Sequence, residues 1–262
     1  MVFVAGHFGE WVQGRVGPGL DLVLVTLACP GMGVSARFEP AERFAVSQGR
    51  KVLSTGQCEA LLARIGADLS VKVLLDVSLP PGGGAGMSTA ALVALARAAG
   101  AEETAIPDIC REIEGASDPL MLDRPDAAIW APRKAQVVAF APPPPAAEIV
   151  GGFWREPFRT DPEDCDFPIV DDLIKDWAKG PELAEAARIA SASADRTTAL
   201  RGPADDRTPQ IAKALGALGY ARAHTGSARA FIFAPASAPE SAEAILAEAG
   251  YSHILRFATG GR

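Results

Sequence analysis

Residues 78–100 read SLPPGGGAGMSTAALVALARAAG, a glycine-rich run followed by a long apolar one. The first ten of these residues contain four glycines and two prolines. Glycine loses more conformational freedom on folding than any other residue, so a cluster of glycines requires a compensating role. Either the backbone makes a tight turn here, or it approaches a ligand closely.

The segments on the two sides of the glycines have different periodicities. Residues 71–79 alternate between apolar and polar positions, which predicts a half-buried strand that ends at the two prolines. Residues 88–99 are apolar on every side and predict a buried helix, with Ser88 at the N-cap and Gly100 just past the C-terminus. A glycine-rich loop between a strand and a helix gathers free backbone N–H groups and the positive end of the helix dipole. Such a point binds phosphate or another anion.

Two common versions of such a loop do not fit this sequence. A Walker A loop needs Gly-Lys followed by Ser or Thr at the helix start, and residues 80–90 contain no lysine. A dinucleotide fingerprint needs G-x-G-x-x-G, but Thr89 stands where a third glycine would follow Gly84 and Gly86. From composition alone, a turn without any ligand remains the alternative.

The whole chain has the composition of a globular protein. Of its 262 residues, 48% are hydrophobic and 22% are charged, and the length suits one large domain or two modest ones. The formal net charge is −7 and Lys and Arg do not cluster, which argues against a nucleic-acid or anionic-membrane partner. No apolar run reaches membrane length and the N-terminus lacks a signal-peptide pattern, so we expect a cytoplasmic protein. The four cysteines lack metal or disulfide spacing, which is typical of reduced thiols.

Local patterns predict further elements before residue 146. Residues 21–27 predict a strand, with residues 31–38 as its pairing partner. Residues 107–114 predict a second helix that Gly115 ends, and residues 137–140 predict a short strand. The four consecutive prolines at 142–145 indicate a stiff, extended connector.

The composition changes after the prolines. Alanine-rich helices are predicted over residues 181–200, 208–218 and 239–249, and short strands over 228–233 and 253–257. The chain therefore has the pattern of an α+β protein with two lobes. We expect residues 1–141 to form the first lobe, residues 142–147 the connector and residues 148–262 the second lobe.

Five segments resemble the GHMP kinases, a superfamily named after galactokinase, homoserine kinase, mevalonate kinase and phosphomevalonate kinase. Residues 80–90 resemble its P-x-x-x-G-L-x-S-S-A phosphate loop. Residues 9–14 (GEWVQG) resemble the G-E-L-x-Q-G signature of the L-threonine kinase branch, whose members are associated with propanediol utilisation and cobalamin synthesis. Residues 24–30 echo the L-V-T-x-x-C-P pattern of that branch. Residues 223–227 (AHTGS) resemble its third motif, and residues 257–262 its S-G-G-x-R tail.

The resemblance implies a fold, an activity and a substrate. The expected fold is α+β, with a ribosomal-protein-S5-domain-2-like N-terminal lobe and a ferredoxin-like C-terminal lobe. The expected reaction is the ATP- and Mg²⁺-dependent phosphorylation of a hydroxyl on a small molecule. L-threonine is the favoured acceptor, with O-phospho-L-threonine, a cobalamin side-chain precursor, as product. Neither nucleic acid nor membrane is an expected partner, and the oligomeric state is left open.

The resemblance also assigns roles in phosphoryl transfer, which needs held phosphates, neutralised charge and a positioned hydroxyl. Ser88 and Glu114 would bind Mg²⁺ through hard oxygen ligands. Asp118 would act as the base or orienting group for the acceptor, because residues 114–118 resemble the E-P-[ST]-D segment of the branch. Without the resemblance, Ser88 is a simple helix cap and Asp118 a turn residue. The nucleotide phosphates would be bound by Gly82, Gly83, Gly84, Ala85, Gly86, Met87, Ser88 and Thr89.

Acceptor binding is assigned to both ends of the chain. Glu10 and Gln13 lie in the signature that lines the acceptor pocket by resemblance, and a carboxylate and an amide can recognise ammonium and hydroxyl groups. Thr225, Gly226 and Ser227 would close the site from the second lobe.

Three other polar residues carry weaker signals. His7 and His224 lack metal-ligand spacing and are more typical of packed, hydrogen-bonded residues than of catalysts. Arg15 is a candidate partner for a substrate carboxylate, although no motif supports it.

Departures from the family pattern keep other functions open. Met87 replaces a serine, Ala85 replaces Leu or Met, and residues 149–156 match the expected D-T-G-G-x-V-D-T stretch poorly. One alternative is a GHMP kinase for homoserine or another small alcohol, and a second is a nucleotide-binding relative without turnover. A third is a Rossmann oxidoreductase, which NAD(P) binding in place of ATP would favour.

Overall fold

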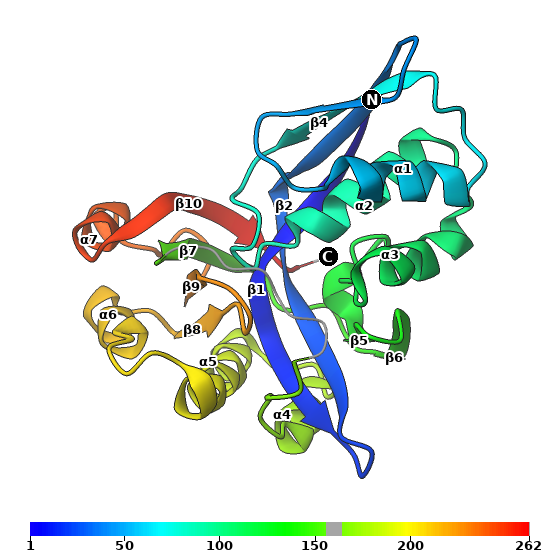
Figure 1. The fold of residues 1–262 in the computed structure, drawn as a ribbon. Coiled ribbons are helices and arrows are strands. Elements are labelled where there is room, and N and C mark those ends of the chain that lie inside the picture. Colours follow the sequence, from blue (N-terminus) through cyan, green and yellow to red (C-terminus); the bar gives the residue numbers. More distant parts are fainter. Residues whose placement is uncertain (156–163, 262) are drawn as a thin grey trace.

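A computed structural model describes residues 1–155 and 164–261 of the chain. It has a mixed α+β architecture, in which a single curved sheet runs through the molecule and helices pack along it (Figure 1). Glu156, from the stretch compared with D-T-G-G-x-V-D-T, and Arg262, from the tail motif, lie outside the described residues.

The sheet is organised around one long antiparallel hairpin, made of β1 (Val2–Val16) and β2 (Asp21–Pro40). Beyond β2 the sheet continues with β4 (Val71–Val77) and β3 (Ala45–Gln48). Beyond β1 it continues, in spatial order, with β8 (Gly219–Arg222), β9 (Ala228–Phe233), β7 (Ala147–Trp154) and β10 (Tyr251–Thr259). A side branch on β2 is formed by β5 (Ala128–Ala131) and β6 (Gln136–Phe140).

Helices from both halves of the chain pack on this hairpin (Figure 1). Helix α2 (Met87–Ala98) contacts β1 and β2, and helix α5 (Leu183–Arg201) contacts β1 and β8. The other helices are α1 (Thr55–Arg64), α3 (Ile106–Glu114), α4 (Asp171–Trp177), α6 (Thr208–Leu215) and α7 (Ala242–Glu248), with short 3₁₀ turns at Glu103–Ala105 and Pro125–Ala127.

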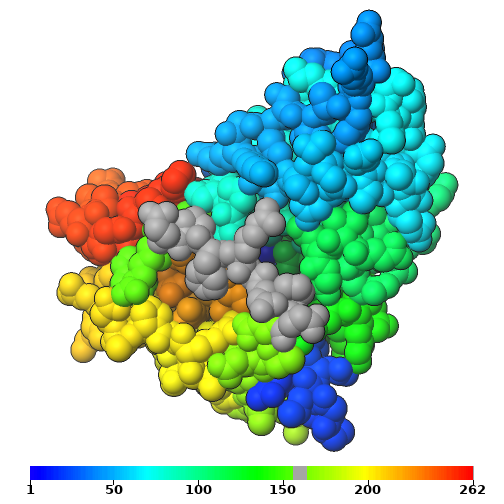
Figure 2. Space-filling model, in the orientation of Figure 1, coloured from blue at the N-terminus to red at the C-terminus, as the bar shows by residue number. Residues whose placement is uncertain are grey.

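The two halves of the chain occupy different sides of the molecule. In the space-filling view, residues from yellow to red gather on one side and residues from cyan to green on the other (Figure 2). The four prolines link β6 to β7 without helix or strand. Strands β1 and β8 meet in a single register pair, Glu10 with Arg222, so the sheet is narrow where the halves join. The division into lobes at residues 141–147 stays a prediction, since α4 and α5 also contact β1.

The core is apolar and extends across both halves. Trp11, Trp130 and Trp177 are fully buried, while Trp154 is half-buried. Within residues 1–155 and 164–261, no helix combines the length and apolar character needed to cross a membrane.

Predictions next to the glycines are confirmed, whereas one predicted strand pair is wrong. The strand at 71–79 and the helices at 88–99 and 107–114 appear within one or two residues of their predicted bounds. Residues 31–38 do not pair with residues 21–27, because both belong to β2. The register jumps from Gly33 to Cys29 on β2 between adjacent residues of β1, so an irregularity absorbs the interruption without turning the chain.

Helix α1 was not predicted, although the sequence contains a start signal for it. Ser54 accepts a hydrogen bond from the Gln57 N–H, and the Gln57 side chain accepts one from the Ser54 N–H. This reciprocal pair is a capping box, whose Ser-x-x-Gln pattern is visible in the sequence. Strands β1, β3, β5, β7 and β8 and helix α4 were also missed.

Candidate functional site

The residues assigned to the site converge on one cavity of about 390 Å³. Its walls come from β1, β2, the glycine loop, the start of α2, the end of α3 and the segment that follows α3. Among the predicted site residues that line it are Gly82, Gly84, Ala85, Gly86, Met87, Ser88, Thr89, Glu114, Asp118, Glu10, Gln13 and Thr225.

The glycine loop takes a backbone path that suits glycine alone. Gly82, Gly84 and Gly86 have φ angles of 78°, 79° and 67°, a region that other L-residues adopt only with strain. Gly86 is the N-cap of α2, so the helix begins directly at the cavity, with the positive end of its dipole toward it. Gly83 does not line the cavity, because it packs against the Phe153 ring.

Ser88 does not cap helix α2, which corrects the expectation from sequence. The helix starts one residue earlier, at Met87, with Gly86 as its N-cap and without a side-chain cap. The Ser88 hydroxyl instead donates to Glu114 Oε1, the last residue of α3. Gly115 ends α3 in the left-handed conformation, at φ 78°, and thereby turns the chain toward Asp118.

Ser88 and Glu114 together fit a magnesium ion better than a transition metal. Both offer hard oxygen atoms at the cavity wall. In the described part of the chain, no group of three or more His, Cys, Asp or Glu side chains could hold a metal. Mg²⁺ needs no such cage, since it commonly takes one or two protein oxygens and completes its shell with phosphates and water.

Asp118 is fixed by contacts to one of its two carboxylate oxygens. His7 Nε2 lies 3.2 Å from Asp118 Oδ2, and Thr89 Oγ1 donates to the same oxygen at 3.4 Å. The Asp118 N–H also donates to Thr89 Oγ1 at 3.3 Å. Within the described residues Oδ1 has no hydrogen-bond partner, and the residue lines the cavity.

His7 is a site residue that sequence reasoning missed. It lies on β1, is almost fully buried and lines the cavity. Burial alone would lower the pKa of its imidazole, but the charge of Asp118 and the hydrogen bond to it, with smaller contributions from Glu10 and the Gly9 carbonyl, raise the pKa to about 9. A partner 111 positions away leaves no local signal in the sequence.

Glu10 is held by a buried network from the second half of the chain. Its Oε2 accepts from the His224 N–H at 3.3 Å and lies 3.2 Å from His224 Nδ1. The other ring nitrogen of His224 lies 3.0 Å from Ser193 Oγ, which accepts from the Gln13 N–H. Burial lowers the pKa of His224 more than Glu10 raises it, so the contact with Glu10 is a hydrogen bond from a neutral ring.

Gln13 and Arg133 also lie on the wall of the cavity. Gln13 Oε1 is buried at the cavity without a hydrogen-bond partner among the described residues. Arg133, from the turn between β5 and β6, brings a cation to the same wall. Arg15 is not on this wall, since its Nε donates to the Phe167 carbonyl at 2.8 Å.

The turn between β8 and β9 packs against the back of the glycine loop. The Ala228 N–H donates to the Gly83 carbonyl at 2.9 Å, and a Cβ on Gly226 would lie 2.6 Å from the Gly84 nitrogen. Thr225 reaches the cavity, but Gly226 and Ser227 do not. Gly226 and Ser227 pack behind the loop and do not line this cavity, and their substrate contact stays a prediction.

We expect Gly226→Ala to lower the free energy of unfolding by about 1–3 kcal/mol, the usual cost of overpacking. The added methyl group would overlap the Gly83 and Gly84 backbone, which cannot move without disturbing the loop. Urea denaturation measures the change. Gly31→Ala is the matched control, because a Cβ there meets nothing within 4 Å. Equal midpoints for the two variants would contradict the close packing of turn and loop.

Comparisons with known proteins identify the fold. No protein-family model matches the chain. No curated protein sequence matches it either. Among solved structures, L. major mevalonate kinase in complex with R-mevalonate is 12% identical, with a TM-score of 0.65 over 98% of this chain and 94% of that one. Lactococcus lactis galactokinase with galactose is 9% identical, with a TM-score of 0.61 over 98% and 93%.

A homoserine kinase from Cytophaga hutchinsonii is similar at the same level. It is 14% identical, with a TM-score of 0.56 over 98% of this chain and 94% of that one. The likeness therefore extends over nearly the whole length of the compared chains. It shows that the chain has the two-lobed α+β fold of the GHMP kinases.

Proposed function

We propose that this protein is a kinase that transfers the γ-phosphoryl group of ATP to a hydroxyl group of a small molecule, with Mg²⁺. One observation carries the proposal: Ser88 of α2 meets Glu114 and Asp118, from the end of α3 and the segment that follows it, in one cavity at the N-terminus of α2. A phosphate site, two hard oxygens and a carboxylate are the parts that phosphoryl transfer needs. The fold is compatible with this activity, because mevalonate kinase and homoserine kinase share it.

The glycine loop is the proposed nucleotide site. Main-chain N–H groups between Gly82 and Thr89, together with the dipole of α2, would hold the nucleotide phosphates. Ser88 Oγ and Glu114 would hold Mg²⁺, which neutralises phosphate charge when bound. Met87 is buried, so its replacement of a serine removes one hydroxyl but leaves the main-chain N–H groups of the loop in place.

Asp118 is the proposed orienting base for the acceptor. The acceptor oxygen forms a bond to the γ-phosphorus while the bond to the β,γ-bridging oxygen breaks, and ADP leaves with that electron pair. The hydroxyl proton passes to Asp118 Oδ1, the carboxylate oxygen without a protein partner in the described structure. Because the transition state is loose, alignment of the hydroxyl contributes more than the strength of the base.

An amino acid with a hydroxyl group, L-threonine in first place, is the proposed acceptor. The buried Gln13 Oε1 needs a donor, and Arg133 on the same wall is suited to a carboxylate. Glu10 would add negative charge near an ammonium group, and Thr225 a hydroxyl. The resemblance of residues 9–14 to the L-threonine kinase signature supports the same choice. Under this proposal the product is O-phospho-L-threonine, a cobalamin side-chain precursor, and the protein is cytoplasmic.

Thermal shift and steady-state assays test the function. Because a ligand that binds only the folded protein raises its stability, ATP with Mg²⁺ should raise Tm, by an amount that grows with the ratio of ligand concentration to Kd. L-threonine, L-serine, homoserine and small alcohols are then assayed with ATP, and EDTA should stop turnover. Turnover of homoserine alone would contradict the L-threonine assignment.

A nucleotide-binding relative without turnover is the second candidate. Met87 favours it, since a hydroxyl common to the family loop is missing. ATP-dependent stabilisation without phosphorylation of any acceptor would support this candidate. Stabilisation by NAD(P) but not by ATP would contradict both.

A further inference from the structure

The His7 ring is clamped between two acceptors from different segments. Nδ1 lies 3.3 Å from the Gly9 carbonyl and Nε2 lies 3.2 Å from Asp118 Oδ2. The His7 N–H donates to the Ala85 carbonyl at 3.2 Å, which ties this part of β1 to the glycine loop. A Cβ on Gly86 would overlap the imidazole, so the glycine N-cap of α2 is also the space that the ring needs. The position of the ring is thus determined by backbone on two sides.

These contacts constrain the protons on the ring. A carbonyl only accepts, so Nδ1 carries a proton and donates to Gly9. At Nε2 the partner is a carboxylate that already accepts from Thr89 Oγ1 on the same oxygen. With a proton on Nε2 as well, the ring is an imidazolium in contact with the Asp118 carboxylate. The raised pKa of His7, about 9, agrees with this state at neutral pH.

The cation directs the carboxylate. His7 and Thr89 together occupy Oδ2, so the carboxylate is held in one orientation with Oδ1 left for a ligand in the cavity. The positive charge also lies beside two other acidic groups, Glu10 and Glu114, that line the same cavity. Without a cation here, three carboxylates would face one space.

We propose that His7 is a positioning residue for the phosphoryl transfer: as an imidazolium it holds the Asp118 carboxylate in place, with Oδ1 directed at the acceptor hydroxyl. This inference rests on the proposed kinase function, but the His7–Asp118 pair can be tested without it. His7 touches neither nucleotide nor acceptor in this role, and it acts through Asp118.

Other titratable groups face the pair from two elements. Glu10 of β1 has its Oε1 3.9 Å from His7 Nδ1. On α3, the buried Cys110 thiol lies close enough to Glu114 and Asp118 to feel their charges. Burial and then these two charges raise the pKa of the thiol to about 12. The thiol therefore stays neutral in the range where His7 titrates.

The first experiment uses NMR on the full-length protein labelled at its three histidines. In the wild type, His7 should remain protonated up to about pH 9. In Asp118→Asn the titration midpoint should fall by about 1–3 pH units, because an opposite charge at hydrogen-bond distance is lost. A wild-type midpoint at or below the usual histidine range, or no change in the variant, would overturn the proposal whether or not the protein is a kinase.

The second experiment measures kcat against pH. In the wild type, deprotonation removes the cation, so kcat should fall as the pH rises through about 9. His7→Gln keeps an N–H donor without a charge; we expect kcat lower by about 10–100-fold at neutral pH, little change in KM for ATP, and no alkaline fall. His253→Asn, at an exposed position on β10, is the control and should keep the wild-type profile.

The two experiments separate the possible failures. An absence of turnover in the wild type removes the proposed function. The NMR titration still decides whether His7 is an imidazolium paired with Asp118. A His7→Gln protein with wild-type kcat and an unchanged alkaline fall overturns the positioning role. Should His7→Gln fail to fold, the wild-type pH profile together with the Asp118→Asn titration decides the question.

Discussion

Asp118→Asn lowers kcat by at least about a hundredfold while ATP binding is retained, the loss expected when a positioned acid–base group is removed. The amide keeps the shape of the side chain but cannot take the hydroxyl proton. It also ends the charge pairing with His7. Since Asp118 lies beyond the end of α3 and not in the glycine loop, nucleotide affinity should change little. Initial rates at saturating ATP, with ATP affinity from thermal shift, measure the two effects.

Asp123→Asn is the matched control for this substitution. Asp123 is exposed, lies five positions further along the same segment and does not line the cavity. Its variant should have the wild-type rate. If Asp118→Asn also had the wild-type rate, Asp118 would have no role in the reaction, and the positioning role of His7 would fall with it.

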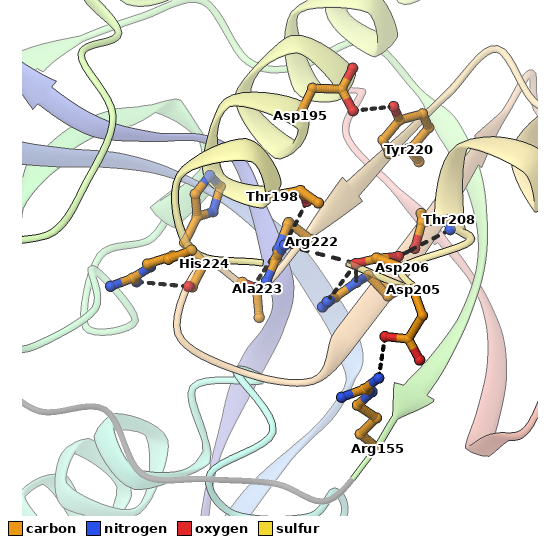
Figure 3. Close-up of polar contacts among 12 residues, drawn as sticks. Arg155, Asp195, Thr198, Asp205, Asp206, Thr208, Tyr220, Arg222, Ala223 and His224 are labelled. Atoms are coloured by element: carbon orange, nitrogen blue, oxygen red, sulfur yellow. Dashed lines mark hydrogen bonds and ion pairs between the residues drawn. The ribbon is translucent and has the colours of Figure 1, made fainter. Parts of the chain in front are cut away.

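Asp206→Ala lowers the free energy of unfolding by about 3–5 kcal/mol, the cost of leaving a buried charge without its partner. Arg229 donates to Asp206 Oδ2 from Nη2 at 2.9 Å, and Arg222 Nη1 lies 3.8 Å from the same oxygen. Figure 3 shows Asp206 between Arg222 and Thr208, whose N–H donates to its Oδ1. The Asp206 side chain is only 3% exposed, so water cannot replace it.

The neighbouring Asp205 supplies the control. It pairs with Arg155 (Figure 3), but its side chain is 66% exposed. Asp205→Ala should therefore leave the urea midpoint close to that of the wild type, because surface ion pairs contribute little. A similar loss in both variants would contradict the buried-charge argument.

The contribution of Asp206 to the free energy of unfolding also depends on pH in a defined direction. Burial alone would raise the pKa of the Asp206 carboxyl, but Arg229 and Thr208 lower it overall. A depressed carboxyl pKa in the folded state stabilises the protein above the unfolded value, and the stabilisation is lost as the pH falls through the folded one. The difference between wild type and Asp206→Ala should accordingly shrink under acidic conditions.

The β8–β9 hairpin connects the charge cluster of Asp206, Arg222 and Arg229 to the candidate site. Arg222 and Arg229 lie on the two strands of that hairpin, and its turn packs against Gly83. Loss of Asp206 should thus loosen the support of the glycine loop as well as the fold. The sequence contains no motif for this cluster, because its members come from a loop and two strands.

The parts of the site that were predictable are those encoded by neighbouring residues. Glycines at three left-handed positions, prolines that end a strand and an apolar helix are local properties of residues 71–99. The helix end at Gly115 is another. Even here the N-cap was misplaced by two positions, because Ser88 is drawn to Glu114 by a tertiary contact instead of capping its own helix.

The sequence by itself thus determined that a strand, a glycine loop and a buried helix follow one another, with the helix N-terminus directly after the glycines. Only the tertiary structure decided which side chains surround that terminus. His7 meets Asp118, and Glu10 meets His224, across more than a hundred positions of chain. Local conformation follows from the chemistry of adjacent residues, whereas these pairs depend on the register of β1 against β2 and β8 and on how the helices pack over the sheet.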